Sequence, residues 1–111
     1  MLPQIRGWLE RLVRLRKDLE QQEQRLEGLM APGRDLGGTV VNSRARLLAA
    51  LKEVLLEFEQ REIQIKDLDR GLIDFPALLG GREVFLCWEQ KEEDIEFWHE
   101  LDAGYAGREP L

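Results

Sequence analysis

The chain has 111 residues with a formal net charge of −6, and 43% of the residues are apolar. This length predicts one domain over residues 1–111, and the apolar content argues against disorder. The acidic balance argues against nucleic-acid binding, because a negative chain repels phosphate backbones unless a local basic patch intervenes.

A single cysteine, Cys87, excludes an intramolecular disulfide. No run of about eighteen apolar residues occurs, so neither a membrane span nor a membrane partner is expected. Charged residues interrupt the apolar ones within the first eleven positions, unlike in a secretory signal. These features together predict a cytoplasmic protein.

Apolar residues recur every three or four positions near the start of the chain, which predicts a long first helix with a coiled-coil-like seam. The helix should stop near Ala31, because Pro32 and Gly33 follow. Gln22 interrupts the seam, and a lone polar residue there is typical of a device that fixes register or partner choice. The seam consists of Ile5, Trp8, Leu12, Leu15, Leu19, Leu26 and Leu29.

A flexible connection is expected over residues 32–42, which contain one proline and three glycines. Asn42 or Ser43 can cap a second helix. The two helices predict an antiparallel hairpin over residues 1–62. Because the chain is small, we expect two hairpins to form a four-helix bundle, and hence a homodimer. The second seam consists of Leu48, Leu51, Leu55 and Phe58.

The apolar period changes to two after Glu62, which predicts strands. Turns are expected at Asp69-Arg70-Gly71 and at Gly80-Gly81, and Pro76 should end a strand or lie on an edge. The fold class is therefore α+β, with a long antiparallel two-helix hairpin followed by a small three- or four-stranded antiparallel sheet. Residues 63–111 form this sheet and a C-terminal flap.

A hairpin around Lys91-Glu92 would pair the last two strands. It would set Trp88 against Ile95, Leu86 against Phe97 and Val84 against His99, with Cys87 and His99 on opposite faces. Phe85 and Trp98 would share the second face. The C-terminal tail or a second subunit should cover that face, because large exposed apolar patches are rare.

Three stretches of the second half form a specific pattern: "KDLDRGLIDFP" from Lys66, "GREVFLCW" from Gly81 and "FWHELDAGYAGREPL" from Phe97. This pattern resembles the bacterial domain-of-unknown-function family 2203. The match covers the last 46 residues, and the helices agree only in general pattern. The resemblance implies the domain outline and no established activity.

His99 is the one side chain that ordinarily titrates near neutrality. It could join Asp74, Cys87, Glu100 or Asp102 in a metal site. However, no H-E-x-x-H or C-x-x-C spacing occurs, and strand neighbours point to opposite faces. We therefore predict no metal and no cofactor, and expect a buried histidine that bonds a carboxylate or carbonyl. A buried Asp74–His99 pair would be the best catalytic or pH-sensitive candidate.

The glycine-rich tail offers two interpretations. Arg108 could grip an anion that the backbone approaches closely, or the tail could be a flap in which Arg108 pairs with Asp74 or Asp102 and Tyr105 plugs the sheet. Cys87 is expected to be a structural cysteine among aromatic neighbours. The candidate ligand-binding residues are Asp74, His99, Glu100, Asp102, Tyr105 and Arg108.

Phosphate-binding loops and nucleophile elbows are absent from the sequence, which argues against hydrolases, kinases and dehydrogenases. We assign no catalytic residue and no small-molecule ligand. The favoured hypothesis is a non-enzymatic interaction or assembly module that homodimerises through its helices. The alternative is a small metal- or anion-binding domain or enzyme that uses Asp74, His99, Glu100, Asp102 and Arg108.

Overall fold

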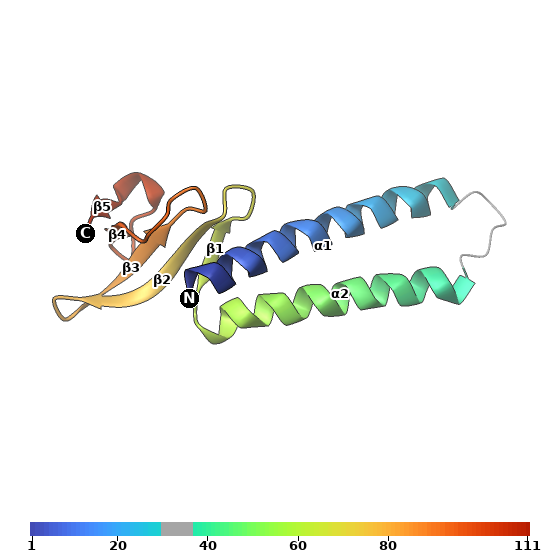
Figure 1. Ribbon diagram of the computed structural model, residues 1–111, viewed down its shortest axis with the longest axis horizontal. Helices are drawn as coiled ribbons and strands as arrows, with labels where there is room; N and C mark the ends of the chain where they lie inside the picture. Colours follow the sequence, from blue (N-terminus) through green and yellow to red (C-terminus); the bar gives the residue numbers. More distant parts are fainter. Residues whose placement is uncertain (30–36) are drawn as a thin grey trace.

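The computed structural model describes residues 1–29 and 37–111, and the side chains of residues 1–25 and 41–111. It has the predicted α+β architecture, in which α1 (Leu2–Leu29) and α2 (Gly37–Gln60) precede a five-stranded antiparallel sheet. The two helices run side by side and project away from the sheet (Figure 1), so the molecule measures 64 × 24 × 24 Å. Neither helix, over its described residues, is long and apolar enough to cross a bilayer.

The core of the hairpin is concentrated at its sheet end, and it contains Phe58 of the predicted second seam, whereas Leu48 and Leu55 of that seam are exposed. Trp8 packs edge-on against Phe58, with the ring centres 5.6 Å apart. Farther from the sheet, none of the side chains of residues 16–25 and 41–53 is buried. The buried residues of this core are Ile5, Leu9, Leu12, Leu15, Val54 and Phe58.

The second helix begins at Gly37, so the prediction that Asn42 or Ser43 caps it was wrong. The side chain of Ser43 turns toward α1 instead, where its Oγ accepts a hydrogen bond of 2.7 Å from Gln22 Nε2. Gln22 therefore joins the two helices within one chain, although its Oε1 is buried without a partner. The expected stop at Pro32 and Gly33 lies outside the described residues, and α1 ends at Leu29.

The strands pair in chain order as a meander: β1 (Gln64–Asp67), β2 (Leu72–Leu79), β3 (Arg82–Trp88), β4 (Phe97–His99) and β5 (Glu109–Pro110). There is one strand more than predicted, because the tail adds β5 beside β4. Gly80-Gly81 forms the expected two-residue turn, with φ of 58° and 80°. Pro76 does not end β2, but it lies beyond the part of β2 that pairs with β1, where no ladder bond needs its missing N–H.

The predicted register between β3 and β4 was wrong by one residue. Leu86 pairs with Trp98, and Cys87 pairs with Phe97. A one-residue shift moves every side chain to the other face, so Cys87 and His99 share a face while Phe85 and Trp98 do not. Ile95 lies in the connection and not in the strand. The shift arises because residues 89–96 form a wide loop in place of a tight turn at Lys91-Glu92.

The two faces of the sheet have different partners. Ile73 and Trp88 pair across β2 and β3, and both belong to the core formed with the helices. Trp88 is fully buried, and the Arg6 guanidinium lies 4.8 Å from the centre of its ring. Strand neighbours alternate in direction, so Asp74 and Cys87 point away from the hairpin.

Gly71 closes the β1–β2 turn, where both its positive φ and the close approach of Gln90 favour glycine. A substitution at Gly71 tests whether both constraints matter. Its φ is 64°, and a Cβ at this position would lie 2.5 Å from Gln90 Cβ. Gly71→Ala should therefore lower the free energy of unfolding by more than about 2 kcal/mol, as measured by urea denaturation. Gly80→Ala is the matched control, because its φ of 58° faces open space and should cost about 1 kcal/mol. Equal losses would contradict the close approach at Gln90.

Candidate functional site

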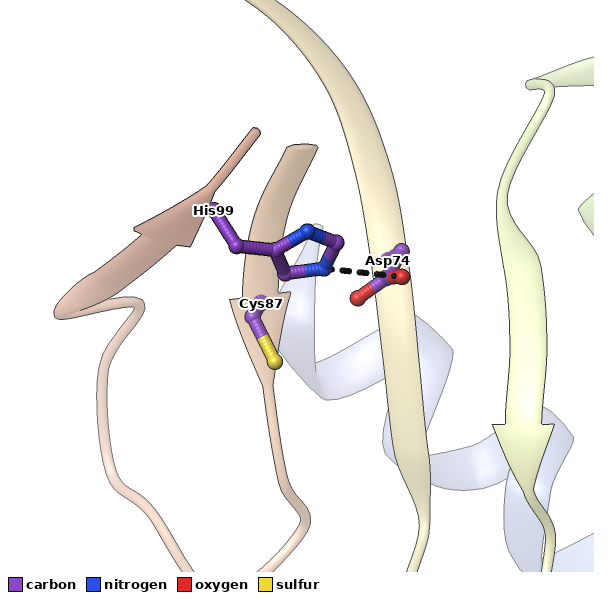
Figure 2. Close-up of side chains that lie close together, drawn as sticks. All are labelled: Asp74, Cys87 and His99. Carbon is purple, nitrogen blue, oxygen red and sulfur yellow. Dashed lines mark ion pairs between the residues drawn. The ribbon is translucent and has the colours of Figure 1, made fainter. Parts of the chain in front are cut away.

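Three neighbouring strands bring Asp74, Cys87 and His99 together on the face of the sheet away from the hairpin. Asp74 and Cys87 are paired across β2 and β3, and His99 projects from β4 toward both (Figure 2). A ligand atom from each of the three lies within 4.8 Å of the others. Asp74 is 3% exposed, Cys87 1% and His99 2%, so the cluster is almost completely shielded from bulk water.

His99 is the buried histidine that the sequence predicts, and it bonds a backbone carbonyl as expected. Its Nδ1 lies 2.7 Å from the Glu100 carbonyl oxygen. A carbonyl only accepts hydrogen bonds, so Nδ1 carries a proton. Nε2 lies 3.0 Å from Asp74 Oδ2, which confirms the predicted Asp74–His99 proximity. Although this oxygen is close, it does not lie in the direction that a hydrogen bond from Nε2 requires, so Nε2 has no hydrogen-bond partner.

This arrangement differs from that of a nucleophilic cysteine with a histidine base. In such a triad one ring nitrogen faces the nucleophile while the other faces the orienting group. Here Nδ1 of His99 faces a backbone carbonyl and Nε2 faces Asp74. Neither ring nitrogen faces the sulfur of Cys87 as a base faces its nucleophile. Cys87 and His99 share a face, but with Asp74 they form a convergence of one nitrogen, one oxygen and one sulfur donor.

Two opposing influences act on the thiol of Cys87. Burial raises its pKa, the carboxylate of Asp74 adds to that effect, and the guanidinium of Arg108 opposes both. Arg108 NH1 lies 3.9 Å from Sγ. Because burial dominates, the pKa of Cys87 lies above its ordinary value and the thiol is protonated at neutral pH. This agrees with the expectation of a structural, unreactive cysteine.

A pocket of about 260 Å³ opens onto the three side chains. Asp74, Cys87 and His99 line it from the sheet, and residues of the tail line it as well. The remaining lining is mostly apolar, with Lys66 and Tyr105 as further polar groups. The tail therefore covers this face of the sheet, as the flap interpretation predicts. The other lining residues are Leu72, Phe85, Leu101, Ala103 and Gly104.

Arg108 holds the tail in place, but through a different partner from those expected. Its NH1 and NH2 donate to the Glu92 carboxylate at 3.0 and 3.2 Å, so the predicted pairing with Asp74 or Asp102 was wrong. The guanidinium also lies over the rings of Phe97 and Tyr105. The arginine is thus already occupied by a carboxylate, which argues against its use as an anion grip.

The other predicted candidates lie apart from the cluster. The carboxylate of Glu100 pairs with Arg82 on the surface, although the backbone carbonyl of Glu100 holds His99. Asp102 is exposed and does not line the pocket. Tyr105 lines the pocket, and its hydroxyl donates to Glu89 Oε2 at 3.3 Å.

Glu89 and Glu92 are structural residues that the sequence reasoning missed. Glu89 is 2% exposed, and its carboxylate receives Arg70 Nε at 2.8 Å and the Tyr105 hydroxyl. Both glutamates lie in an acidic run of the sequence. No local signal separates a buried glutamate from exposed neighbours, because its arginine partner lies far along the chain. Cys87 was considered as a metal ligand but left out of the candidate ligand-binding residues, because the predicted register placed it and His99 on opposite faces.

The fold and the site together define an α+β protein in which a helical hairpin carries a small sheet with a buried donor cluster. The chain matches, over residues 1–111, the model of the family described as "Uncharacterized conserved protein (DUF2203)". It belongs to this family, which confirms the resemblance and extends it to the helices. No curated protein and no solved structure matches the chain significantly.

The contact between Arg108 and Glu92 should stabilise the tail measurably, since both side chains are only 14% exposed. Arg108→Ala should lower the free energy of unfolding by about 1–3 kcal/mol. It should also speed hydrogen exchange at the Leu111 amide, which donates to the Glu96 carbonyl. Arg82→Ala removes an exposed ion pair with Glu100 and should cost less than about 1 kcal/mol. Slow exchange at Leu111 in Arg108→Ala would show that the tail does not depend on this contact.

Proposed function

We propose that this protein is an assembly module that homodimerises through its helical hairpin. The observation that carries the proposal is a second apolar face on α2, on the side away from α1. Figure 1 shows α1 along one side of α2 and no other element along the opposite side. Val41, Leu48 and Leu55 recur at intervals of seven residues and are not covered by α1, since they are 62%, 45% and 43% exposed.

This face is wide enough for a helix to pack against. At 3.6 residues per turn, its members span about 120° of the helix circumference. Between Val41 and Leu56 the face contains one charged residue, Lys52, whose aliphatic stem can pack on apolar surface while the amine reaches water. Contiguous exposed apolar patches of this kind mark interaction surfaces. Besides the three residues named above, the face contains Ala45, Ala49 and Leu56, all of them exposed.

A second copy of the chain fits the face better than an unrelated partner, because the stripe is symmetric about its centre. Val41 and Leu55 lie seven residues before and after Leu48. In an antiparallel pair of α2 helices centred on Leu48, Val41 would therefore meet the partner's Leu55, and Leu48 would meet itself. Such self-complementary contact is what a two-fold interface requires. Lys52 would lie near the small side chain of Ala45 in the other copy.

The shape of the hairpin supports the same proposal. Side chains of residues 16–25 and 41–53 include none that is buried, so the outer half of the rod has little core of its own. Isolated helices are marginal without tertiary packing, and coiled-coil-type contact with a second hairpin would supply it. This arrangement places four helices together, with the two α2 helices in the middle.

Two further parts of the proposal concern the organisation and location of the chain. Hairpin and sheet are proposed to form one domain, which is supported by the core that Leu9, Phe58, Ile73 and Trp88 share. A cytoplasmic, non-enzymatic role is part of the same proposal, and its non-enzymatic part is supported by the lack of a nucleophile–base pair in the described cluster.

Light scattering coupled to size-exclusion chromatography tests the dimer. The full chain at micromolar concentration should have about twice the mass of a 12.9 kDa monomer. Leu48→Glu should weaken dimerisation at least tenfold, because it would place two carboxylates at the centre of the interface. Sedimentation over a concentration series would give the dissociation constant.

A matched control uses the same substitution at an exposed leucine outside the helices. Leu78 on β2 is 72% exposed, so Leu78→Glu should leave the dimer intact. A monomeric wild-type chain at these concentrations, or equal weakening by the two substitutions, would overturn the proposal.

A further inference from the structure

We propose that Asp74, Cys87 and His99 form a binding site for a single transition-metal ion, with Zn²⁺ as the best-suited occupant. The ion would use one carboxylate oxygen, the sulfur and Nε2 of the imidazole. These atoms converge within 4.8 Å from three adjacent strands. This inference goes beyond the assembly role, because it concerns the face of the sheet away from the hairpin.

The strongest observation is the state of His99 Nε2. This atom is buried and has no hydrogen-bond partner, which is rare for a buried polar atom. Since Nδ1 holds the ring proton against the Glu100 carbonyl, Nε2 of a neutral ring carries a lone pair. Nε2 lies 3.0 Å from Oδ2 of Asp74. The two atoms are therefore placed to share one cation, and a metal ion bound by both would satisfy Nε2.

The contact at Nδ1 has the form that metal-binding histidines require. Such a histidine usually donates its other ring N–H to a carbonyl or carboxylate, which fixes the tautomer and orients the ring. The Glu100 carbonyl performs this role at 2.7 Å, from the residue next to His99. The donor atoms also come from paired strands and not from loops, so their positions are held by the sheet.

The donor set determines which ions fit. A thiolate and an imidazole select zinc and other late first-row metals over Mg²⁺ and Ca²⁺, which prefer oxygen ligands alone. Three protein ligands leave a fourth tetrahedral position free, as in zinc sites that bind water or an added ligand. Here that position would face the pocket lined by Lys66 and Tyr105. A small anion is the ligand chemistry that the ammonium group of Lys66 would favour.

Charge and protons balance in the binding step. The sulfur binds as a thiolate, so Zn²⁺ displaces the thiol proton of Cys87 to solvent as the Zn–S bond forms. The thiolate and the Asp74 carboxylate together contribute two negative charges, which neutralise the ion inside a buried site. No electron is transferred, and no other reactant is needed.

Zinc titration of the full chain tests this site. Protein treated with EDTA and kept reduced should bind Zn²⁺ at one ion per chain in isothermal titration calorimetry, with release of a proton. Co²⁺ should give the near-ultraviolet thiolate-to-cobalt charge-transfer absorption that a bound sulfur produces. Cys87→Ser and His99→Gln should each weaken Zn²⁺ binding at least tenfold, and Cys87→Ser should abolish the charge-transfer band.

Two control variants separate this site from other effects. Asp102→Asn removes a nearby exposed carboxylate that does not line the pocket and should bind Zn²⁺ like wild type. Leu48→Glu should also bind normally, whether or not it alters the oligomeric state. Circular dichroism would verify that each ligand variant is folded. Zn²⁺ should raise the melting temperature of wild type but not of Cys87→Ser, because an ion that binds only the native state stabilises it.

The proposal is overturned if wild type and Cys87→Ser bind Zn²⁺ with equal affinity, or if wild type shows no saturable one-to-one binding. A folded Cys87→Ser variant that retains the full melting-temperature shift would have the same meaning. If both ligand variants fail to fold, the cobalt spectrum of wild type decides alone, since a spectrum without thiolate absorption contradicts coordination by Cys87.

Discussion

The architecture of the sheet depends on how Glu92 organises the loop between β3 and β4. Its backbone carbonyl accepts hydrogen bonds from Trp88 Nε1 at 3.0 Å and from Arg6 at 2.7 Å. Its carboxylate accepts the Glu89 amide and both terminal nitrogens of Arg108. One residue thus connects the first helix, the core tryptophan, the end of β3 and the tail. The loop it shapes sets the register that brings His99 onto the same face as Cys87.

Local patterns were sufficient for the helices and the turns but not for this register. Apolar periodicity located both helices, and the glycines at the β1–β2 and β2–β3 turns adopt the positive φ angles that only glycine accepts readily. The pairing of β3 with β4 could not be predicted in this way. Trp88 and Leu86 match Ile95 and Phe97 in apolar character, so the wrong register looked well packed. Contacts from residues as distant as Arg6 select the right one.

The candidate site could be predicted only in part, because local patterns do not determine how the strands pair. Asp74 and His99 were recognised as a possible pair, because each is a polar residue among apolar neighbours in a strand. Only the error in the predicted β3–β4 register placed Cys87 on the other face from His99. Glu100 and Asp102 were grouped with His99 because they are close in sequence, yet their carboxylates lie elsewhere. Proximity across a sheet follows strand pairing and not chain distance, so a site built from three strands requires the correct pairing first.

Two adjacent residue pairs explain how the core and the donor cluster are linked. Ile73 and Trp88 oppose each other and pack against the helices, while the next residues along, Asp74 and Cys87, oppose each other on the far face. Because neighbouring side chains in a strand point in opposite directions, the packing that holds Trp88 also determines where the sulfur of Cys87 lies. The hairpin therefore positions the donor atoms without touching them. A core substitution beneath Trp88 would therefore displace the cluster as a unit. The outer face of α2 is a separate surface, because it lies along the rod that projects from the sheet (Figure 1).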